Sequence, residues 1–229
     1  MTLILVAHGT RRPEGLAMIG DLVERVGSVL GHPVQVGFVD VLGPTPSEIL
    51  SAAAATAEPA VVVPAFLSRG YHVHTDLPMH IAASGHPDVT VTPALGPSPH
   101  IAQIVSEQLS HSGWRPGDSV ILAAAGTSDS RARADLRATA TLLSALLGSS
   151  VRPAFAATGA PSVREAVTEA RSRSDRRVAV ASYLLADGMF AHQLRNCGAD
   201  LVSEPLSTHP TLARLIAGRF QAARTCARV

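Results

Sequence analysis

Short apolar runs alternate along this chain with longer segments in which apolar residues recur at helical spacing. Leu3 to Ala7 is an aliphatic run, and Val61 to Val63 is a β-branched run bounded by prolines. Both are typical of strands buried on both faces. Between them, residues 14–30 carry leucine, isoleucine and valine on one helical face. This alternation predicts an α/β fold built on parallel sheet.

The same criteria place the remaining elements, with proline and glycine marking their ends. Thr75 and Asp76 are expected to cap the third helix, with Pro78 in its first turn. Strands are expected over residues 3–7, 34–42, 61–63, 89–93, 120–124, 151–155, 178–185 and 201–202, and helices over 13–30, 47–57, 78–83, 97–112, 131–147, 163–173, the segment after 190, and 211–223.

The order of elements repeats in the second half of the chain, and so do short motifs. The segment VAHGT aligns with AAAGT, and FLSRGYHVH aligns with LLADGMFAH. The offset is 117 residues between Gly9 and Gly126, and 118 between Gly70 and Gly188. An internal duplication is the simplest explanation. The turn-rich residues 113–118 suggest a boundary, which gives halves of 1–114 and 115–229. We expect two similar lobes, each a four-stranded parallel sheet with helices on both faces, facing each other across a cleft.

Composition narrows the function. Of 229 residues, 46% are hydrophobic and only 3% are aromatic, and the formal net charge is +1. These values argue against nucleic-acid binding and against a membrane-surface role. All 19 basic residues are arginine, which excludes Schiff-base chemistry and a P-loop lysine. The first residues lack the order of a secretory signal, and no apolar run has the length of a membrane span. A cytoplasmic protein is expected.

Three side chains able to bind a metal or take a proton follow three different strands of the first half: His8, Asp40 and His72. The carboxyl ends of parallel strands lie along one edge of a sheet, so these side chains can converge there. Two imidazoles and a carboxylate would leave open positions on a divalent ion. The second half has Ala125, Ala157 and Phe190 in the corresponding places. One chemically active half and one supporting half is the better interpretation of this joint loss.

Two motifs resemble those of the sirohydrochlorin chelatases, which insert cobalt or iron into a tetrapyrrole. The first is His8-Gly9-Thr10-Arg11, where the family has serine at the third place. The second runs from Phe66 to Pro78, FLSRGYHVHTDLP, with leucine where the family has isoleucine. Long members of that family are also duplicated, with a degenerate second half. Where they often carry a glutamate after the second strand, this chain has Asp40, which is shorter and puts direct coordination in doubt.

The resemblance implies insertion of divalent cobalt or ferrous iron into sirohydrochlorin, in sirohaem or cobalamin biosynthesis, with no organic cofactor. Nickel also accepts such ligands. It implies His8 and His72 as catalytic residues, and His8, His72 and Asp40 as metal ligands, with Asp40 assisting. The substrate-binding residues it implies come from the two motifs: Thr10, Arg11, Ser68, Arg69 and Gly70. The arginines there, with Arg12 beside them, could pair with the substrate's carboxylates.

Alternatives stay open at this point. A carrier of tetrapyrrole or metal, without turnover, would use the same ligands. A histidine phosphatase also has a histidine after its first strand, but that chemistry needs an arginine just before the histidine, where this chain has Ala7. The partners expected are the tetrapyrrole and the metal, without nucleic acid or membrane, in a monomer or a homodimer.

Overall fold

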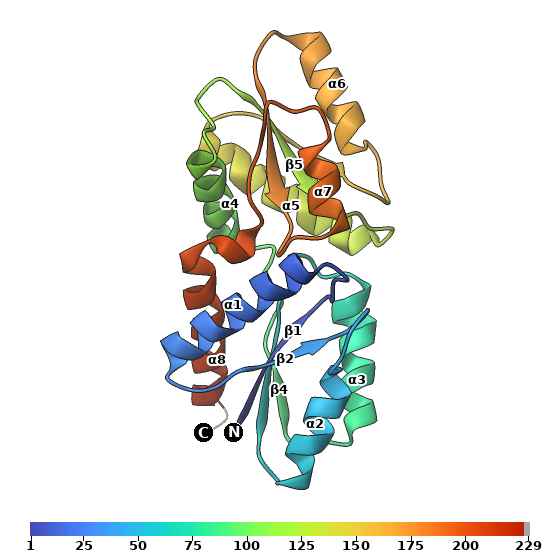
Figure 1. Cartoon of the computed structure of the whole chain (residues 1–229), viewed down its shortest axis with the longest axis vertical. Helices are drawn as coiled ribbons and strands as arrows, with labels where there is room; N and C mark the ends of the chain where they lie inside the picture. Colours follow the sequence, from blue (N-terminus) through green and yellow to red (C-terminus); the bar gives the residue numbers. More distant parts are fainter. Residues whose placement is uncertain (227–229) are drawn as a thin grey trace. The chain divides into compact units, whose positions relative to one another are not determined.

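The computed structural model describes residues 1–226, which form two four-stranded parallel sheets (Figure 1). The strand orders are β2-β1-β3-β4 and β6-β5-β7-β8, so the same topology occurs twice. The expected α/β class, with two similar four-stranded lobes, is confirmed. The strands are β1 (Thr2–Ala7), β2 (Gln35–Phe38), β3 (Ala60–Pro64), β4 (Val89–Val91), β5 (Ser119–Ala124), β6 (Val151–Phe155), β7 (Val178–Tyr183) and β8 (Leu201–Val202).

Helices cover both faces of each sheet. The α-helices are α1 (Pro13–Leu30), α2 (Pro46–Ala55), α3 (Leu77–Ser84), α4 (Pro99–His111), α5 (Ser130–Leu147), α6 (Val163–Arg173), α7 (Met189–Arg195) and α8 (Pro210–Cys226). In the first sheet α1 packs beside α8, and α2 beside α3 on the other face; in the second, α4 packs beside α5. The central strands β1, β3, β5 and β7 are almost entirely buried, as strands covered on both faces must be.

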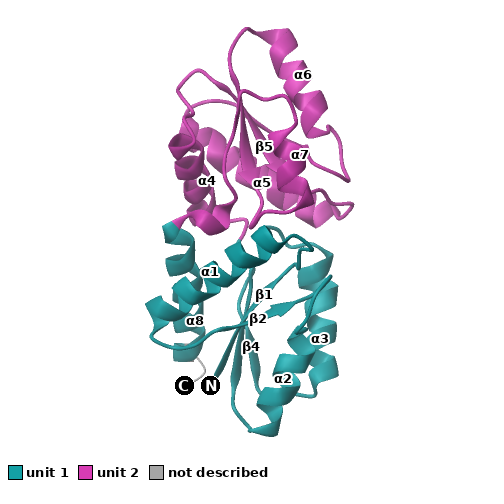
Figure 2. Cartoon of the chain, viewed as in Figure 1, with its two compact units in different colours: residues 1–95, 210–229 teal, residues 96–209 magenta. Residues whose placement is uncertain are grey.

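The two compact units divide the chain differently from the expected halves 1–114 and 115–229. One unit comprises residues 1–95 and 210–229, and the other comprises residues 96–209 (Figure 2). The cause is an exchange of helices. The apolar face of α4, which includes Ile101, Ile104 and Leu109, packs against α5 and β7, whereas α8 packs against α1 and β3. The last helix of each half of the sequence, α4 or α8, therefore belongs to the unit formed mainly by the other half.

Strand register confirms the internal duplication. Ala7 pairs with Phe38 in the first sheet, and Ala124 pairs with Phe155 in the second, an offset of 117 residues for both members. The beginnings of α2 and α6 also correspond. Both helices start with a capping box, formed by Thr45 with Glu48 and by Ser162 with Glu165. In each box the hydroxyl accepts the backbone N–H of the glutamate while the glutamate accepts the backbone N–H of the cap, so two unpaired helix donors are satisfied.

The second strand ends four residues earlier than its alternating pattern predicted, at Phe38 instead of Leu42. The Phe38 N–H donates to the carbonyl of Pro44, and the Leu42 N–H donates to the carbonyl of Asp40. These hydrogen bonds stabilise a turn over residues 39–45. They use backbone N–H and carbonyl groups that a longer strand would need for pairing, so the strand ends at Phe38. Asp40 consequently lies in a loop two residues beyond the strand. Within residues 1–226, no helix has both the length and the apolar character required to cross a bilayer.

Stability of the second unit is expected to depend on the protonation of His209. This imidazole is 3% exposed and lies 3.1 Å from the Glu107 carboxylate, with the His111 ring stacked on it. Burial lowers the pKa of His209 from 6.5, and the neighbouring Glu107 opposes that shift without cancelling it. His209 therefore binds a proton less readily in the folded state than in the unfolded state. The free energy of unfolding consequently falls as the pH drops below about 6.5.

Urea unfolding at pH 7.5 and pH 5.5 tests this dependence. The wild type should lose more unfolding free energy between the two pH values than His209→Gln, which cannot titrate. Equal losses would show that His209 does not contribute.

Candidate functional site

The carboxyl ends of three adjacent strands bring together His8, Asp40 and His72 in the first unit. Strand β1 lies between β2 and β3, so His8, which follows β1, has a neighbour from each side. The rings of His8 and His72 lie edge to face with their centroids 4.8 Å apart. The Nε2 atom of His8 is 3.8 Å from Oδ2 of Asp40. The convergence predicted from strand order is thus present in the structure.

The hydrogen bond of His8 determines which of its nitrogens is available. Nδ1 lies 2.9 Å from the carbonyl oxygen of Gly9. A carbonyl can only accept, so Nδ1 carries the proton and donates it. In the neutral ring Nε2 then has a free lone pair, which points to a role as a metal ligand or as a proton acceptor. Its side chain is 47% exposed, so this nitrogen is open to an incoming ligand.

Asp76 holds His72 in the same tautomer as His8, with the proton on Nδ1, although the sequence pattern predicts that Asp76 caps a helix. Nδ1 of His72 donates to Oδ2 of Asp76 at 2.7 Å, and the His72 ring stacks on Phe66. The expectation that Asp76 and Thr75 cap the third helix is wrong. Helical geometry begins five residues before α3, in the π-helical turn His72–Asp76, so Asp76 lies one turn after His72 and its side chain caps nothing. A histidine and an acid four residues apart in a helix was the available signal.

Glycine at position 9 is required by the close approach of two loops. A Cβ atom there would overlap the backbone oxygen of Asp40. The absence of a side chain lets the loop after β1 lie against the loop after β2, which places Asp40 beside His8. Val41, the residue after Asp40, adopts φ 73°, in the left-handed region that a β-branched residue rarely occupies. Such strain is found preferentially at functional sites.

The three side chains do not form a complete metal cage. Among residues 1–226, no group of three or more His, Cys, Asp or Glu side chains is arranged to hold a metal ion. The ligand set of His8, His72 and Asp40 stays a prediction. Oδ1 of Asp40 accepts the N–H of Val41 at 2.7 Å, which ties that oxygen to its own turn, whereas Oδ2 faces His8. What the structure provides is a histidine pair with a carboxylate nearby.

The expected substrate-binding residues lie in two loops that flank the histidines. Thr10 and Arg11 belong to the loop between β1 and α1, and Ser68, Arg69 and Gly70 belong to the loop after β3. The guanidinium-bearing residues Arg11 and Arg69 are exposed. Thr10 has a local partner, since its hydroxyl accepts the N–H of Arg12 at the start of α1. The Gly70 carbonyl accepts the N–H groups of Val73 and His74, which starts the helical turn of His72. Their roles in binding remain proposals.

The corresponding positions of the second unit are apolar, and two of them contribute to its core. Ala125 and Phe190 occupy the places of His8 and His72, and both pack partly buried against the cluster around β5 and β7. Ala157, in the place of Asp40, donates its N–H to the carbonyl of Ala125. The second unit therefore keeps the backbone of the site, while Ala125 and Phe190 serve packing and Ala157 is exposed.

One divalent metal ion per chain is consequently the expected stoichiometry. The physical reason is that, among the described residues, only the first unit places two partly exposed imidazoles together at its strand ends. The stacked pair His111 and His209 of the second unit differs, because His209 is buried against Glu107. Isothermal titration of the purified chain with Co²⁺ measures the number of sites. A second site of similar affinity that survives in a His8→Ala, His72→Ala double variant would contradict the assignment.

Replacing Asp40 by asparagine is expected to slow metal insertion by only about tenfold. This lies at the lower end of the 10- to 100-fold range for residues that assist a metal ligand. The carboxylate is 59% exposed and 3.8 Å from His8, so solvent screens its effect. Insertion rates at several metal concentrations test it, with Asp40→Glu expected to retain activity. An Asp40→Asn variant as inactive as His8→Ala would make Asp40 a direct ligand.

The fold and the site define a duplicated parallel α/β protein in which one repeat presents a histidine pair at its strand ends. The chain belongs to the CbiX family, whose model matches residues 2–112 and 119–223. The two matched segments correspond to the two halves of the duplication.

Relatives and a solved structure agree with this family. The sirohydrochlorin cobaltochelatase of Methanothermobacter thermautotrophicus is 31% identical over 128 residues, covering 47% of this chain and 89% of that protein. The sirohydrochlorin ferrochelatase of Priestia megaterium is 27% identical over 202 residues, covering 84% of this chain and 76% of the relative. The structure of SirB from Bacillus subtilis with Fe³⁺ superimposes with a TM-score of 0.81 at 21% identity, covering 97% of this chain and 96% of that one. The resemblance predicted from two motifs is confirmed.

Proposed function

We propose that this chain inserts divalent cobalt or ferrous iron into sirohydrochlorin. The observation that carries the proposal is the pair of Nε2 atoms on His8 and His72. Both are left free by hydrogen bonds at Nδ1, and both belong to rings whose centroids are 4.8 Å apart. Membership of the CbiX family and the activities named for the two relatives give the substrate and the choice of metals.

The reaction exchanges one divalent cation for two protons of the pyrrole N–H groups. Two imidazole nitrogens suit both halves of this exchange, because a neutral histidine can bind the ion or accept a proton. His8, with Asp40 beside it, is the better position for attracting the cation. His72 donates to Asp76, which stabilises the positive charge that the ring gains on taking a proton. Arg11 and Arg69 flank the pair and would bind carboxylates of the substrate.

An anaerobic absorbance assay tests the proposal. Sirohydrochlorin is mixed with cobalt(II), iron(II) or nickel(II) in turn, with and without the chain, and the spectral change on insertion is followed. The chain should accelerate insertion of cobalt or iron well above the spontaneous rate. Rates equal to the spontaneous reaction with every metal would refute the function.

A further inference from the structure

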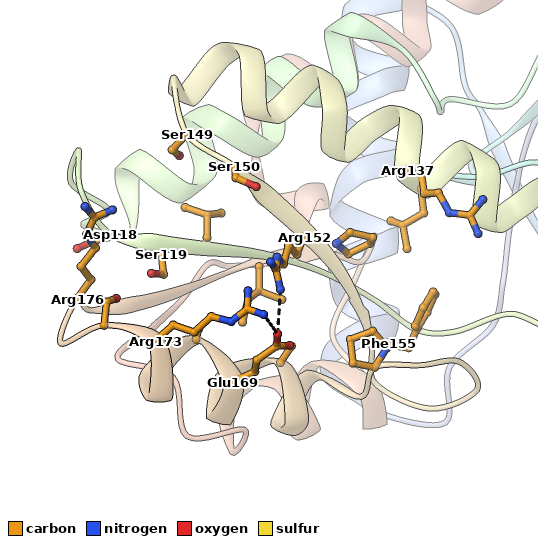
Figure 3. A pocket seen from close by; sticks show the side chains of 18 of the residues that line it. Asp118, Ser119, Arg137, Ser149, Ser150, Arg152, Phe155, Glu169, Arg173 and Arg176 are labelled. Carbon is orange, nitrogen blue, oxygen red and sulfur yellow. Dashed lines mark hydrogen bonds and ion pairs between the residues drawn. The ribbon is translucent and has the colours of Figure 1, made fainter.

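A groove runs along β6, the edge strand of the second sheet, between helices α5 and α6 (Figure 3). Its volume is about 590 Å³, which is enough for a small metabolite. All of its lining residues lie between positions 118 and 176, so it is contained in the second unit and includes no residue of the histidine site. The second unit, which lacks the histidines, therefore has a cavity of its own.

The groove is strongly cationic in a chain that is nearly neutral. Five arginines line it against two carboxylates, Asp118 and Glu169, while the formal net charge of the whole chain is only +1. Figure 3 shows Arg176 and Arg137 near opposite ends of the groove, with Arg152 and Arg173 between them. The five arginines are Arg133, Arg137, Arg152, Arg173 and Arg176. A concave surface with this excess of one charge concentrates ligands of the opposite charge.

Arg152 and Arg173, in the middle of the groove, are paired with Glu169 and keep further N–H donors available. Arg152 and Arg173 both contact the same atom, Oε1 of Glu169, at 3.0 and 2.7 Å. Each guanidinium has five N–H donors, so these contacts leave most of them available for another oxyanion. The Ser149 hydroxyl, which also lines the groove, is buried and has no hydrogen-bond partner. That oxygen is closed to solvent, whereas the side chains of Arg152 and Arg173 are 57% and 59% exposed, so the arginines are the groups that an anion can reach.

The internal duplication supplies a comparison for the arginines. The matching registers of the two sheets and the matching bounds of their helices give the equivalent positions in the first half. None of them is basic: they are Leu16, Gly20, Gln35, Thr56 and Glu58. The two halves share their backbone, so the fold does not require arginine at these places. The cationic groove belongs to the second half alone.

A peptide strand added to the edge of the sheet is a poor candidate for the ligand. The outward N–H of Val151 donates to the Ser144 hydroxyl, Pro153 has no N–H, and the Phe155 N–H donates to the Pro161 carbonyl. Strand addition depends on free main-chain donors along the edge, and β6 offers none at these positions. Recognition must come from the arginine side chains.

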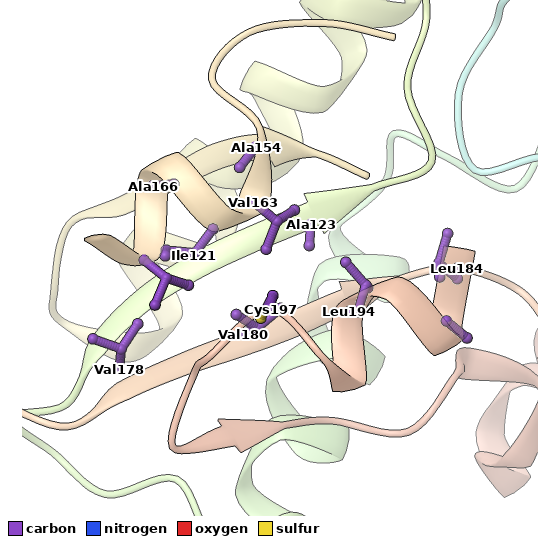
Figure 4. Packing of buried hydrophobic residues seen from close by; sticks show 12 residues of the cluster. Ile121, Ala123, Ala154, Val163, Ala166, Val178, Val180, Leu184, Leu194 and Cys197 are labelled. Carbon is purple, nitrogen blue, oxygen red and sulfur yellow. The ribbon is translucent and has the colours of Figure 1, made fainter. Parts of the chain in front are cut away.

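The floor of the groove is part of the core of the second unit. Ile121 and Ala166 line the groove and also belong to the buried cluster on β5, β7 and α6 (Figure 4). Arg152 projects from β6, and Arg173 from the end of α6, so both arise from elements packed on that core. The shared contact with Glu169 restricts both guanidinium groups, which lowers the ordering cost when a ligand binds.

We propose that this groove binds a small anion with at least two phosphate or carboxylate groups. Arg152 and Arg173 bind one oxyanion in the middle of the groove, and an arginine toward one end binds another. Bidentate pairing with planar or tetrahedral oxyanions is what guanidinium groups do best. This site is separate from the histidine pair, and the proposal stands independently of metal insertion.

Isothermal titration of the full chain at low ionic strength tests the proposal with three probes: pyrophosphate, citrate and orthophosphate. Pyrophosphate or citrate should bind more tightly than orthophosphate, and the preferred one identifies phosphate or carboxylate as the recognised group. An Arg152→Gln, Arg173→Gln double variant should weaken that probe by about tenfold or more, the equivalent of at least one charge-assisted hydrogen bond. Glu169→Gln should tighten it, because the competing carboxylate is gone.

The matched control is Arg171→Gln. It removes one positive charge from α6, the helix that carries Arg173, but Arg171 pairs with Asp200 and does not line the groove. Its affinity for the probe should stay within about twofold of the wild type, since an exposed charge outside the site is screened. The proposal is overturned if no probe binds the wild type, or if the double variant and Arg171→Gln weaken binding equally.

Discussion

Alanine in place of either His8 or His72 is expected to reduce the rate of metal insertion by roughly 10²- to 10⁴-fold, the usual contribution of a positioned proton acceptor. Each substitution removes one of the two Nε2 atoms left free by hydrogen bonding at Nδ1. The remaining ring cannot both hold the ion and take the protons. Steady-state insertion rates for each purified variant provide the measurement.

The fold should survive both substitutions. His8 is 47% exposed and His72 is 31% exposed, so their removal leaves no large buried cavity. Circular dichroism should match the wild type. His100→Ala, which removes an exposed histidine from α4, is the control and should insert metal at the normal rate. Near-normal rates for either of the two site variants would remove the histidine pair from the mechanism.

Substitution of Asp76 by leucine is expected to slow insertion by about 100-fold, at the upper end of the range for a residue that orients a metal-handling histidine. The carboxylate is 17% exposed and accepts the Nδ1–H of His72 at 2.7 Å. Without it the ring can rotate or change tautomer, and Nε2 is no longer kept as the unprotonated nitrogen. Insertion rates against metal concentration measure the loss.

Asp76→Asn distinguishes orientation from simple structural damage. Its amide oxygen can still accept from Nδ1, so it should retain more activity than Asp76→Leu. Asp21→Asn, an exposed change on α1, serves as the control for a lost acidic residue. If the asparagine and leucine variants are equally slow, the hydrogen bond to His72 does not orient the ring.

Much of the fold follows from local patterns that the sequence displays openly. β1, β3 and β7 are almost wholly apolar runs, with Thr2 and Ser182 as the exceptions, which is typical of buried parallel strands. The repeat could be aligned because Phe38 and Phe155, or Gly9 and Gly126, occupy equivalent places in a shared backbone. The candidate site followed from the same fact, since parallel strands deliver His8 and His72 to one edge.

What the sequence could not reveal depends on contacts between distant segments. Which unit α4 and α8 join is decided by the surfaces on which their apolar faces pack, and each helix would look the same in either place. The pattern Thr-Asp-x-Pro predicts a helix start at Asp76. In the structure the π-helical turn His72–Asp76 precedes α3 directly, so Asp76 lies inside a continuous helical segment. The cationic groove was also hidden, because its arginines come from α5, α6 and the segments around β6 and β7.

The most direct test of metal insertion by this chain is the number of metal ions inserted per chain. Sirohydrochlorin and cobalt(II) are supplied anaerobically in large excess over the protein, and the product is counted after the reaction ends. An enzyme that uses its histidine pair to exchange metal for protons should complete many turnovers per chain. A yield that stops at one equivalent would show a carrier that binds the same molecules without catalysing insertion, and would contradict the account.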